Sequence, residues 1–159
     1  MTKSRIDLFL EWILAIILGT MVLDVSWGVI TRYILDSQSS WTDELARFLL
    51  IWLSILGAAY ASGKRLHIAI DLLPKYLNER NQKILDIVTT SIVLLFAIAV
   101  FLIGGLRYVY ISFALGQTSP ALKLPIGFVY IVMPISGLFV CYYKLLELRS
   151  TLKTLKHGN

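Results

Sequence analysis

Long apolar runs separated by short polar segments are the dominant pattern along this chain of 159 residues. Four windows are almost free of ionisable side chains: Trp12–Thr31, Leu45–Ala61, Ile87–Leu106 and Leu124–Tyr143. The hydrocarbon core of a bilayer is about 30 Å thick, and a helix of about 20 apolar residues crosses it. Lipid leaves only helices and closed barrels to pair the backbone, and no window alternates as a barrel strand does. The fold class is therefore predicted to be all-α.

We expect an integral membrane protein with four transmembrane helices, over the approximate spans 10–33, 42–62, 84–110 and 124–146. Together they are expected to form a single domain, residues 1–159. Pro134 lies in the middle of the fourth span and predicts a kink there. Its ring removes one helical hydrogen bond and frees a carbonyl, which neighbouring protein or water must then pair.

The composition agrees with a membrane protein, because 57% of the residues are hydrophobic and only 16% are charged, against about 25% charged in soluble proteins. The net charge of +5 does not indicate a nucleic-acid partner, since the cations lie in short segments and form no basic face. Cytoplasmic flanks of membrane spans retain Lys and Arg. Of the 15 cations, 11 fall on one side of the predicted spans, so both termini are predicted to be cytoplasmic.

The polar segment between the second and third spans, Gly63–Lys83, has apolar residues at helical spacing, with polar and charged residues between them. This pattern favours a short amphipathic helix lying in the membrane interface. A solvated loop that leads into the third span is the alternative reading.

Asp24 is the one carboxylate well inside the first predicted span. A carboxylate at that depth is costly, so it indicates a proton relay, a cation site or a partner for a buried arginine. The structural alternative is an interhelical hydrogen bond, with the carboxyl group protonated. Arg32 lies eight residues further on, about two helical turns along a nearby face, and could draw Asp24 toward the outer interface.

Glu44 and Arg47 are three residues apart at the start of the second span, close enough to pair on one helix face. An exposed pair of this kind contributes only about 0.2–0.5 kcal/mol. Against another subunit at a membrane boundary, separating the two charges would cost more. A cluster that simply caps the start of the helix is the alternative.

Residues for catalysis or cofactor binding are missing from the predicted spans. The two histidines, His67 and His157, fall in predicted cytoplasmic segments, and the single cysteine is Cys141. Haem or metal binding inside the membrane would need imidazole or thiolate ligands facing one another, and a nucleophile would need a base nearby. We therefore expect no enzymatic activity, no metal and no cofactor.

A series of short motifs resembles the signature of a known family. They are Trp41-Thr42-Asp43-Glu44-Leu45-Ala46-Arg47, Ile51-Trp52-Leu53, Leu56-Gly57-Ala58-Ala59 and Lys64-Arg65-Leu66-His67-Ile68, with Arg32-Tyr33 before them and Ser119-Pro120-Ala121-Leu122-Lys123-Leu124-Pro125 after them. In this order and spacing they are similar to the small membrane subunit of tripartite ATP-independent periplasmic (TRAP) transporters, the DctQ-like family.

The resemblance implies a function as well as a fold. In this family a periplasmic binding protein captures an organic anion, and a large membrane subunit carries it by a sodium-coupled elevator motion. The small subunit is a non-catalytic scaffold for the large one in the bacterial inner membrane and helps to dock the binding protein. Sialic acid and C4-dicarboxylates are typical cargoes. The implied partners are the large subunit, the binding protein and membrane lipids.

The motif positions carried over from the family are expected to contact another subunit or lipid. They are Arg32, Trp41, Glu44, Arg47, Trp52, Gly57 and His67. Asp24 is not part of the family pattern, so its meaning rests on its position in the span. It supports the alternative function, a self-contained small homodimeric exporter in which Asp24 exchanges protons for a cationic substrate.

Overall fold

The computed structural model describes residues 2–37, 39–64 and 79–156. Seven helical segments follow one another in it: α1 (Thr2–Tyr33), α2 (Ser40–Gly63), α4 (Glu79–Phe96), η2 (Ala97–Gly104), α5 (Gly105–Ala114), α6 (Ile126–Tyr130) and α7 (Val132–Lys156). His67 and most of the predicted interfacial segment lie outside the described residues. The prediction of an all-α protein is confirmed, because the described residues form no strand.

The helices form four segments that are long and apolar enough to cross a membrane, as predicted. The candidate spans are Arg5–Tyr33, Ser40–Gly63, Asn81–Ala114 and Ile126–Lys153. The third span joins α4, η2 and α5 without a break in the helix, and η2 is a π-helical stretch within it. The fourth span joins α6 and α7. The chain is therefore a multi-pass membrane protein.

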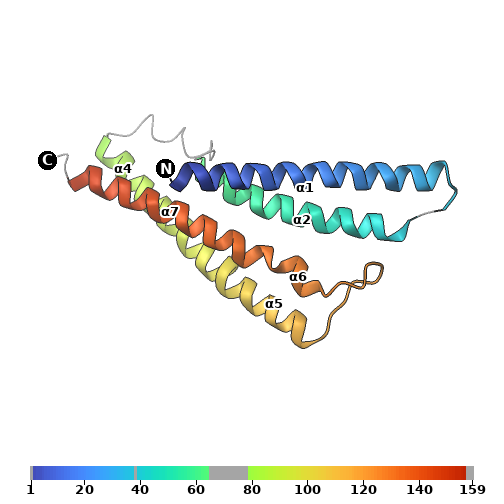
Figure 1. Cartoon of the computed structure of the whole chain (residues 1–159). Coiled ribbons are helices and arrows are strands. Elements are labelled where there is room, and N and C mark those ends of the chain that lie inside the picture. The colour runs from blue at the N-terminus through green and yellow to red at the C-terminus, as the bar shows by residue number, and fades with distance from the viewer. Residues whose placement is uncertain (1, 38, 65–78, 157–159) are drawn as a thin grey trace.

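The spans run back and forth, so that the start of α1, the end of α2, the start of α4 and the end of α7 lie at one end of the bundle (Figure 1). We call this the terminal end. The α1–α2 turn and the connection between α5 and α6 lie at the opposite end, the loop end. Figure 1 shows that α1 and α2 form one pair, that the third and fourth spans form another, and that the pairs diverge toward the loop end.

The fourth span is the centre of the bundle, because half of its most apolar window is buried inside the chain, against 6% for the first span. Leu10, Leu56, Val132 and Tyr143 form one buried cluster, which joins α1, α2 and α7. Much of α1 is apolar but exposed, including Trp12, Ile16 and Leu23. Exposed apolar faces of this kind are suited to contact with lipid or another subunit.

The fourth span is interrupted close to Pro134, where the sequence predicts a kink. Helix α6 ends at Tyr130 and α7 begins at Val132, so the break lies just before the proline. Beside the break, the indole Nε1 of Trp52 on α2 donates a hydrogen bond to the carbonyl of Val129, at 2.9 Å. Pro134 frees the carbonyl four residues earlier, that of Tyr130, so Trp52 pairs the carbonyl next to it in the sequence.

Polar side chains join three helices at the terminal end. The Tyr143 hydroxyl of α7 donates to Asp7 Oδ1 of α1 at 2.6 Å, and this bond is buried. The Tyr60 hydroxyl of α2 donates to Glu11, one turn along α1. Lys64 lies 3.9 Å from Asp7 Oδ2 and 3.4 Å from Glu11 Oε1. These five residues, which we call the terminal network, hold α1, α2 and α7 together.

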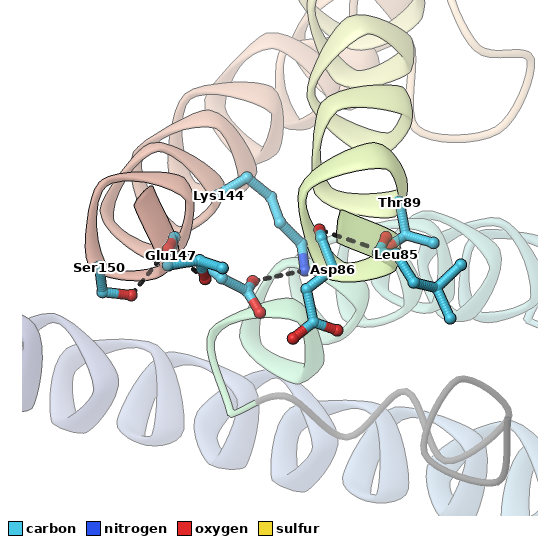
Figure 2. A network of polar contacts seen from close by, with 7 residues as sticks. Leu85, Asp86, Thr89, Lys144, Glu147 and Ser150 are labelled. Carbon is cyan, nitrogen blue, oxygen red and sulfur yellow. Dashed lines mark hydrogen bonds and ion pairs between the residues drawn. The ribbon is translucent and has the colours of Figure 1, made fainter. Parts of the chain in front are cut away.

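A second ion pair at the terminal end lies within α7, on the side that faces α4. The amine of Lys144 is 2.9 Å from Glu147 Oε2, and the lysine side chain is nearly buried. Figure 2 shows Lys144 extending from α7 toward α4, where Asp86 is drawn, while Ser150 donates to the Glu147 carbonyl. Lys144 is one of the cations that predicts the orientation, and the structure gives it a packing role too.

Candidate functional site

Glu44, near the start of α2, reaches out of its own helix to the connection between α5 and α6. Its Oε2 accepts hydrogen bonds from the backbone N–H groups of Ala121, at 2.9 Å, and Leu122, at 2.8 Å. Helical side chains lean toward the N-terminus of their helix, so this carboxylate leans past the start of α2. Hydrogen bonds to an ionised acceptor are about twice as strong as neutral ones.

The segment that receives Glu44, residues 117–125, is folded back on itself. The Ser119 N–H donates to the Leu124 carbonyl at 2.9 Å, and the Lys123 N–H donates to the Ser119 carbonyl at 3.1 Å. Lys123 takes a left-handed backbone conformation, with φ of 53°. We call this segment the outer loop. Its internal bonds make it a compact unit, which Glu44 joins to α2.

The predicted pairing of Glu44 with Arg47 does not occur among the described residues, because the carboxylate is used by the outer loop. Arg47 is exposed on the next turn of α2. Arg32, at the end of α1, pairs with Asp43 across the α1–α2 turn, at 3.6 Å between Nη2 and Oδ2. The sequence had suggested that Arg32 could draw Asp24 toward the outer interface, but its ion-pair partner is Asp43 instead. Both members of this ion pair are about half exposed.

Asp24 is buried between the helices, with 6% of its surface exposed. Neither carboxylate oxygen has a hydrogen-bond partner among the described residues, so the interhelical bond expected from sequence is not formed in this part of the chain. A cavity of about 160 Å³ lies nearby between α1 and α2, and Arg32, Ser39 and Thr42 are among its lining residues. Asp24 is not among the residues that line it.

The other motif residues take different positions on α2. Trp52 lies inside the bundle and pairs the helix break described above. Trp41 is exposed at the start of the helix. Gly57 faces open space, because a methyl group added to it would meet no atom within 4 Å. The predicted contacts of Trp41, Arg47 and Gly57 with another subunit or with lipid stay predictions.

Sequence reasoning missed the terminal network. Asp7 and Glu11 are one helical turn apart and precede the first apolar window, so their spacing could have indicated one polar face. Their partners could not be found in this way, because Tyr143 lies 136 residues from Asp7. In the described part of the chain, His, Cys, Asp and Glu form no group of three or more that could hold a metal ion.

Comparison with known proteins gives a consistent result. The sequence profile of the DctQ component of tripartite ATP-independent periplasmic transporters matches residues 21–154. A putative TRAP transporter small permease protein of Haemophilus influenzae is 32% identical over 143 residues, which make up 90% of this chain and 87% of that protein. The matched region therefore includes all four candidate spans at least in part.

Two further relatives match a smaller share of their own length. The isethionate TRAP transporter permease protein DctMQ of Oleidesulfovibrio alaskensis is 38% identical over 96 residues, which are 60% of this chain but 15% of that protein. The C4-dicarboxylate TRAP transporter small permease protein DctQ of Rhodobacter capsulatus is 28% identical over 102 residues, which are 64% of this chain and 44% of that protein.

Proposed function

The chain belongs to the DctQ component family of TRAP transporters, and from this premise we propose that it is a non-catalytic scaffold for a large, sodium-coupled membrane subunit. The family is a transporter component that works with a large membrane subunit. The profile match across residues 21–154 is the observation that carries the proposal. The narrow cavity and the apolar outer faces are compatible with a scaffold, because they offer no wide polar path for a substrate.

The cargo of the complex is an organic anion, and sialic acid and C4-dicarboxylates are the two candidates. The relatives' names support this class, since isethionate and C4-dicarboxylates are both small organic anions. The small subunit does not bind the cargo in this proposal, so the choice between candidates depends on the other components. The periplasmic binding protein delivers the cargo to the loop end of the bundle.

The central experiment tests the chain as part of a complex. The tagged chain is purified in mild detergent, and a much larger membrane protein is expected to accompany it. Both are then reconstituted in liposomes, and uptake of sialic acid and of a C4-dicarboxylate is measured with a sodium gradient and a binding protein. Uptake should disappear when any component is omitted. Transport by this chain alone would contradict the scaffold function.

The open face of α2 is proposed to contact the large subunit. Gly57 faces open space, and Ser54 and Ala58 beside it are exposed. Small residues allow a neighbouring helix to approach closely. We expect Gly57→Leu to reduce recovery of the complex without unfolding the chain. Gly19→Leu is the matched control, because Gly19 on α1 also has open space around it. If both variants recover the same amount of complex, the Gly57 face of α2 does not contact the large subunit.

In the proposed orientation the terminal end is in the cytoplasm and the loop end faces the periplasm of the bacterial inner membrane. The test uses single cysteines in a Cys141→Ser background, at Ser37 for the loop end and at Lys153 for the terminal end. An impermeant maleimide added to spheroplasts should label position 37 and not position 153. The reverse pattern would overturn the orientation.

The exporter alternative depends on Asp24 and is tested with one substitution. Asp24→Asn keeps the size of the side chain and removes its acidic proton. In the scaffold function, sodium-driven uptake by the whole complex stays near the wild-type rate. Loss of transport with intact assembly would favour proton exchange at Asp24.

A further inference from the structure

We propose that Glu44 is a positioning residue, whose carboxylate holds the outer loop against α2 and thereby fixes the surface that receives the binding protein. The reception of a binding protein rests on the proposed function, whereas the holding of the loop is independent of it. This role is supported by the shared acceptor of two backbone N–H groups, by the hydrogen bonds inside the loop and by the charges around it.

Glu44 is the acceptor that the structure provides for two consecutive backbone donors. The N–H groups of Ala121 and Leu122 both point at Oε2, and successive N–H groups that converge in this way form an anion-binding concavity. Neither group donates to a backbone carbonyl among the described residues. Without the carboxylate, two donors in a part-buried position would lose their acceptor at once.

The outer loop forms a closed unit through its own hydrogen bonds. The Ser119 hydroxyl accepts from the Leu124 N–H at 3.3 Å, and Ser119 is 2% exposed. The Ile126 N–H donates to the Gln117 carbonyl at 2.9 Å, which closes the base of the loop beside α6. The bond from Glu44 is therefore expected to control where this unit lies relative to α2, and to leave its internal fold intact.

A second polar bond keeps the effect of Glu44 local. Trp52 lies eight residues further along α2, about 12 Å along the helix axis, and its indole donates to Val129 of α6. This bond fixes the two helix pairs below the loop. Removing the Glu44 carboxylate should then release the outer loop without separating the helices.

The surface controlled by Glu44 is exposed and carries positive charge. Pro120 and Lys123 are exposed on the outer loop, and Arg47 is exposed on α2. Of the two acids in the first turns of α2, Asp43 pairs with Arg32 and Glu44 bonds to the outer loop. An acidic patch on the binding protein is the complementary partner for such a surface. A loop held in one place lowers the ordering cost of docking.

The experiment uses the whole complex in nanodiscs and three substitutions of Glu44. Glu44→Leu removes the acceptor, Glu44→Asp keeps the charge but shortens its reach, and Glu44→Gln keeps one acceptor oxygen. Asp43→Asn is the matched control, because it removes the neighbouring acid, which pairs with Arg32 at the end of α1. Amide hydrogen exchange at Ala121 and Leu122 reports the position of the loop directly.

Exchange at these two amides should be about 10 to 100-fold faster in Glu44→Leu and Glu44→Asp, as expected from loss of a hydrogen bond to a charged acceptor. The exchange rate in Glu44→Gln should lie between the rates of these two variants and that of the wild type. The rate in Asp43→Asn should equal that of the wild type. Wild-type exchange in both Glu44→Leu and Glu44→Asp would overturn the holding role. If Glu44→Leu does not fold, Glu44→Asp and Glu44→Gln still decide the question.

Uptake separates positioning from a general loss of structure. In the reconstituted system, the concentration of binding protein that gives half-maximal uptake should rise about 2 to 10-fold in Glu44→Asp, from the added cost of ordering the loop, while the maximal rate stays the same. A fall in maximal rate alone would contradict the docking part. If the wild-type complex transports nothing, the proposed function fails, and the exchange data still judge Glu44.

Discussion

At the terminal end, ionisable side chains on α1, α2 and α7 pair with one another, whereas at the loop end the contact that joins α2 to the outer loop runs from a side chain to main-chain groups. Tyr143 and Asp7 illustrate the first arrangement, and Glu44 with Ala121 and Leu122 illustrates the second. Two aromatic residues beside glycines also differ in exposure, because Tyr143 is 3% exposed and Phe113 near the loop end is 42% exposed.

The difference shows how one small membrane protein can have a rigid end and an adjustable end. Side chains on three rigid helices can meet only if those helices keep their places. A bond from a side chain to a loop can be lost while the helices stay together. We therefore expect changes at the terminal end to affect the stability of the bundle, and changes at the loop end to affect the presented surface.

The largest contrast should come from two glycines that each contact an aromatic ring. A methyl group at Gly63 would lie 2.8 Å from Cζ of the buried Tyr143, and one at Gly127 would lie 2.5 Å from Cε2 of the exposed Phe113. Gly63→Ala should lower the free energy of unfolding by about 3 kcal/mol, because the ring cannot move aside. Gly127→Ala should lower it far less, since Phe113 can turn outward.

Titration with sodium dodecyl sulfate, followed by tryptophan fluorescence, measures both glycine variants. Gly57→Ala is a control for the change in helix propensity, because nothing lies near its added methyl group. Equal destabilisation by Gly63→Ala and Gly127→Ala would remove the distinction between the two ends.

Asp7 gives the next effect in size. Asp7→Leu removes the carboxylate that accepts the Tyr143 hydroxyl at 2.6 Å, and a bond to a charged group contributes about 1.5–3 kcal/mol. We expect the free energy of unfolding to fall by about 2 kcal/mol. Asp7→Asn keeps an oxygen acceptor, so its free energy of unfolding should fall by less. Both variants are measured by the same detergent titration. A stable Asp7→Leu variant would show that the terminal network does not hold the bundle.

Arg32→Gln should have a small effect at the loop end. The ion pair with Asp43 is 3.6 Å long and about half exposed, and exposed pairs contribute about 0–1 kcal/mol. The melting temperature of the purified chain should change little, and the variant should lack the weak salt dependence that this pair is expected to give the wild type. A drop as large as that of Asp7→Leu would place the stronger contacts at the loop end.

Alkaline pH should give the smallest change, through Lys64. The hydrogen bond with the Tyr60 hydroxyl, and then that with the Glu11 carboxylate, raise the pKa of the Lys64 amine. Because the pKa of Lys64 is higher in the folded state, protonated Lys64 adds to the free energy of unfolding. This stabilisation is complete below about pH 10.4, the usual pKa of lysine, and is lost as the pH rises through the pKa of Lys64 in the folded state. The melting curves of wild type and Lys64→Met should converge in that range. A constant gap between them would exclude this linkage.

The candidate site was predictable only in part. The family motifs gave Glu44 and Trp52 as positions of interest, and Pro134 lies just after the interruption of the fourth span, near which Trp52 forms its hydrogen bond. The expected partner of Glu44 was wrong, because spacing along one helix identifies neighbours on that helix and nothing beyond it. The loop that takes this carboxylate is 77 residues away in the sequence.

The sequence by itself determined the class, the number of spans and the family, because hydropathy and short motifs are local properties of the chain. Each apolar window is long enough to cross a bilayer wherever its neighbours lie. Only the tertiary structure decided which side chains meet. Asp7 accepts a hydrogen bond from Tyr143, Glu44 accepts hydrogen bonds from the outer loop, and the carboxylate of Asp24 has no hydrogen-bond partner among the described residues. The physical reason is that such contacts depend on how separate helices pack, and chain position alone does not fix that packing.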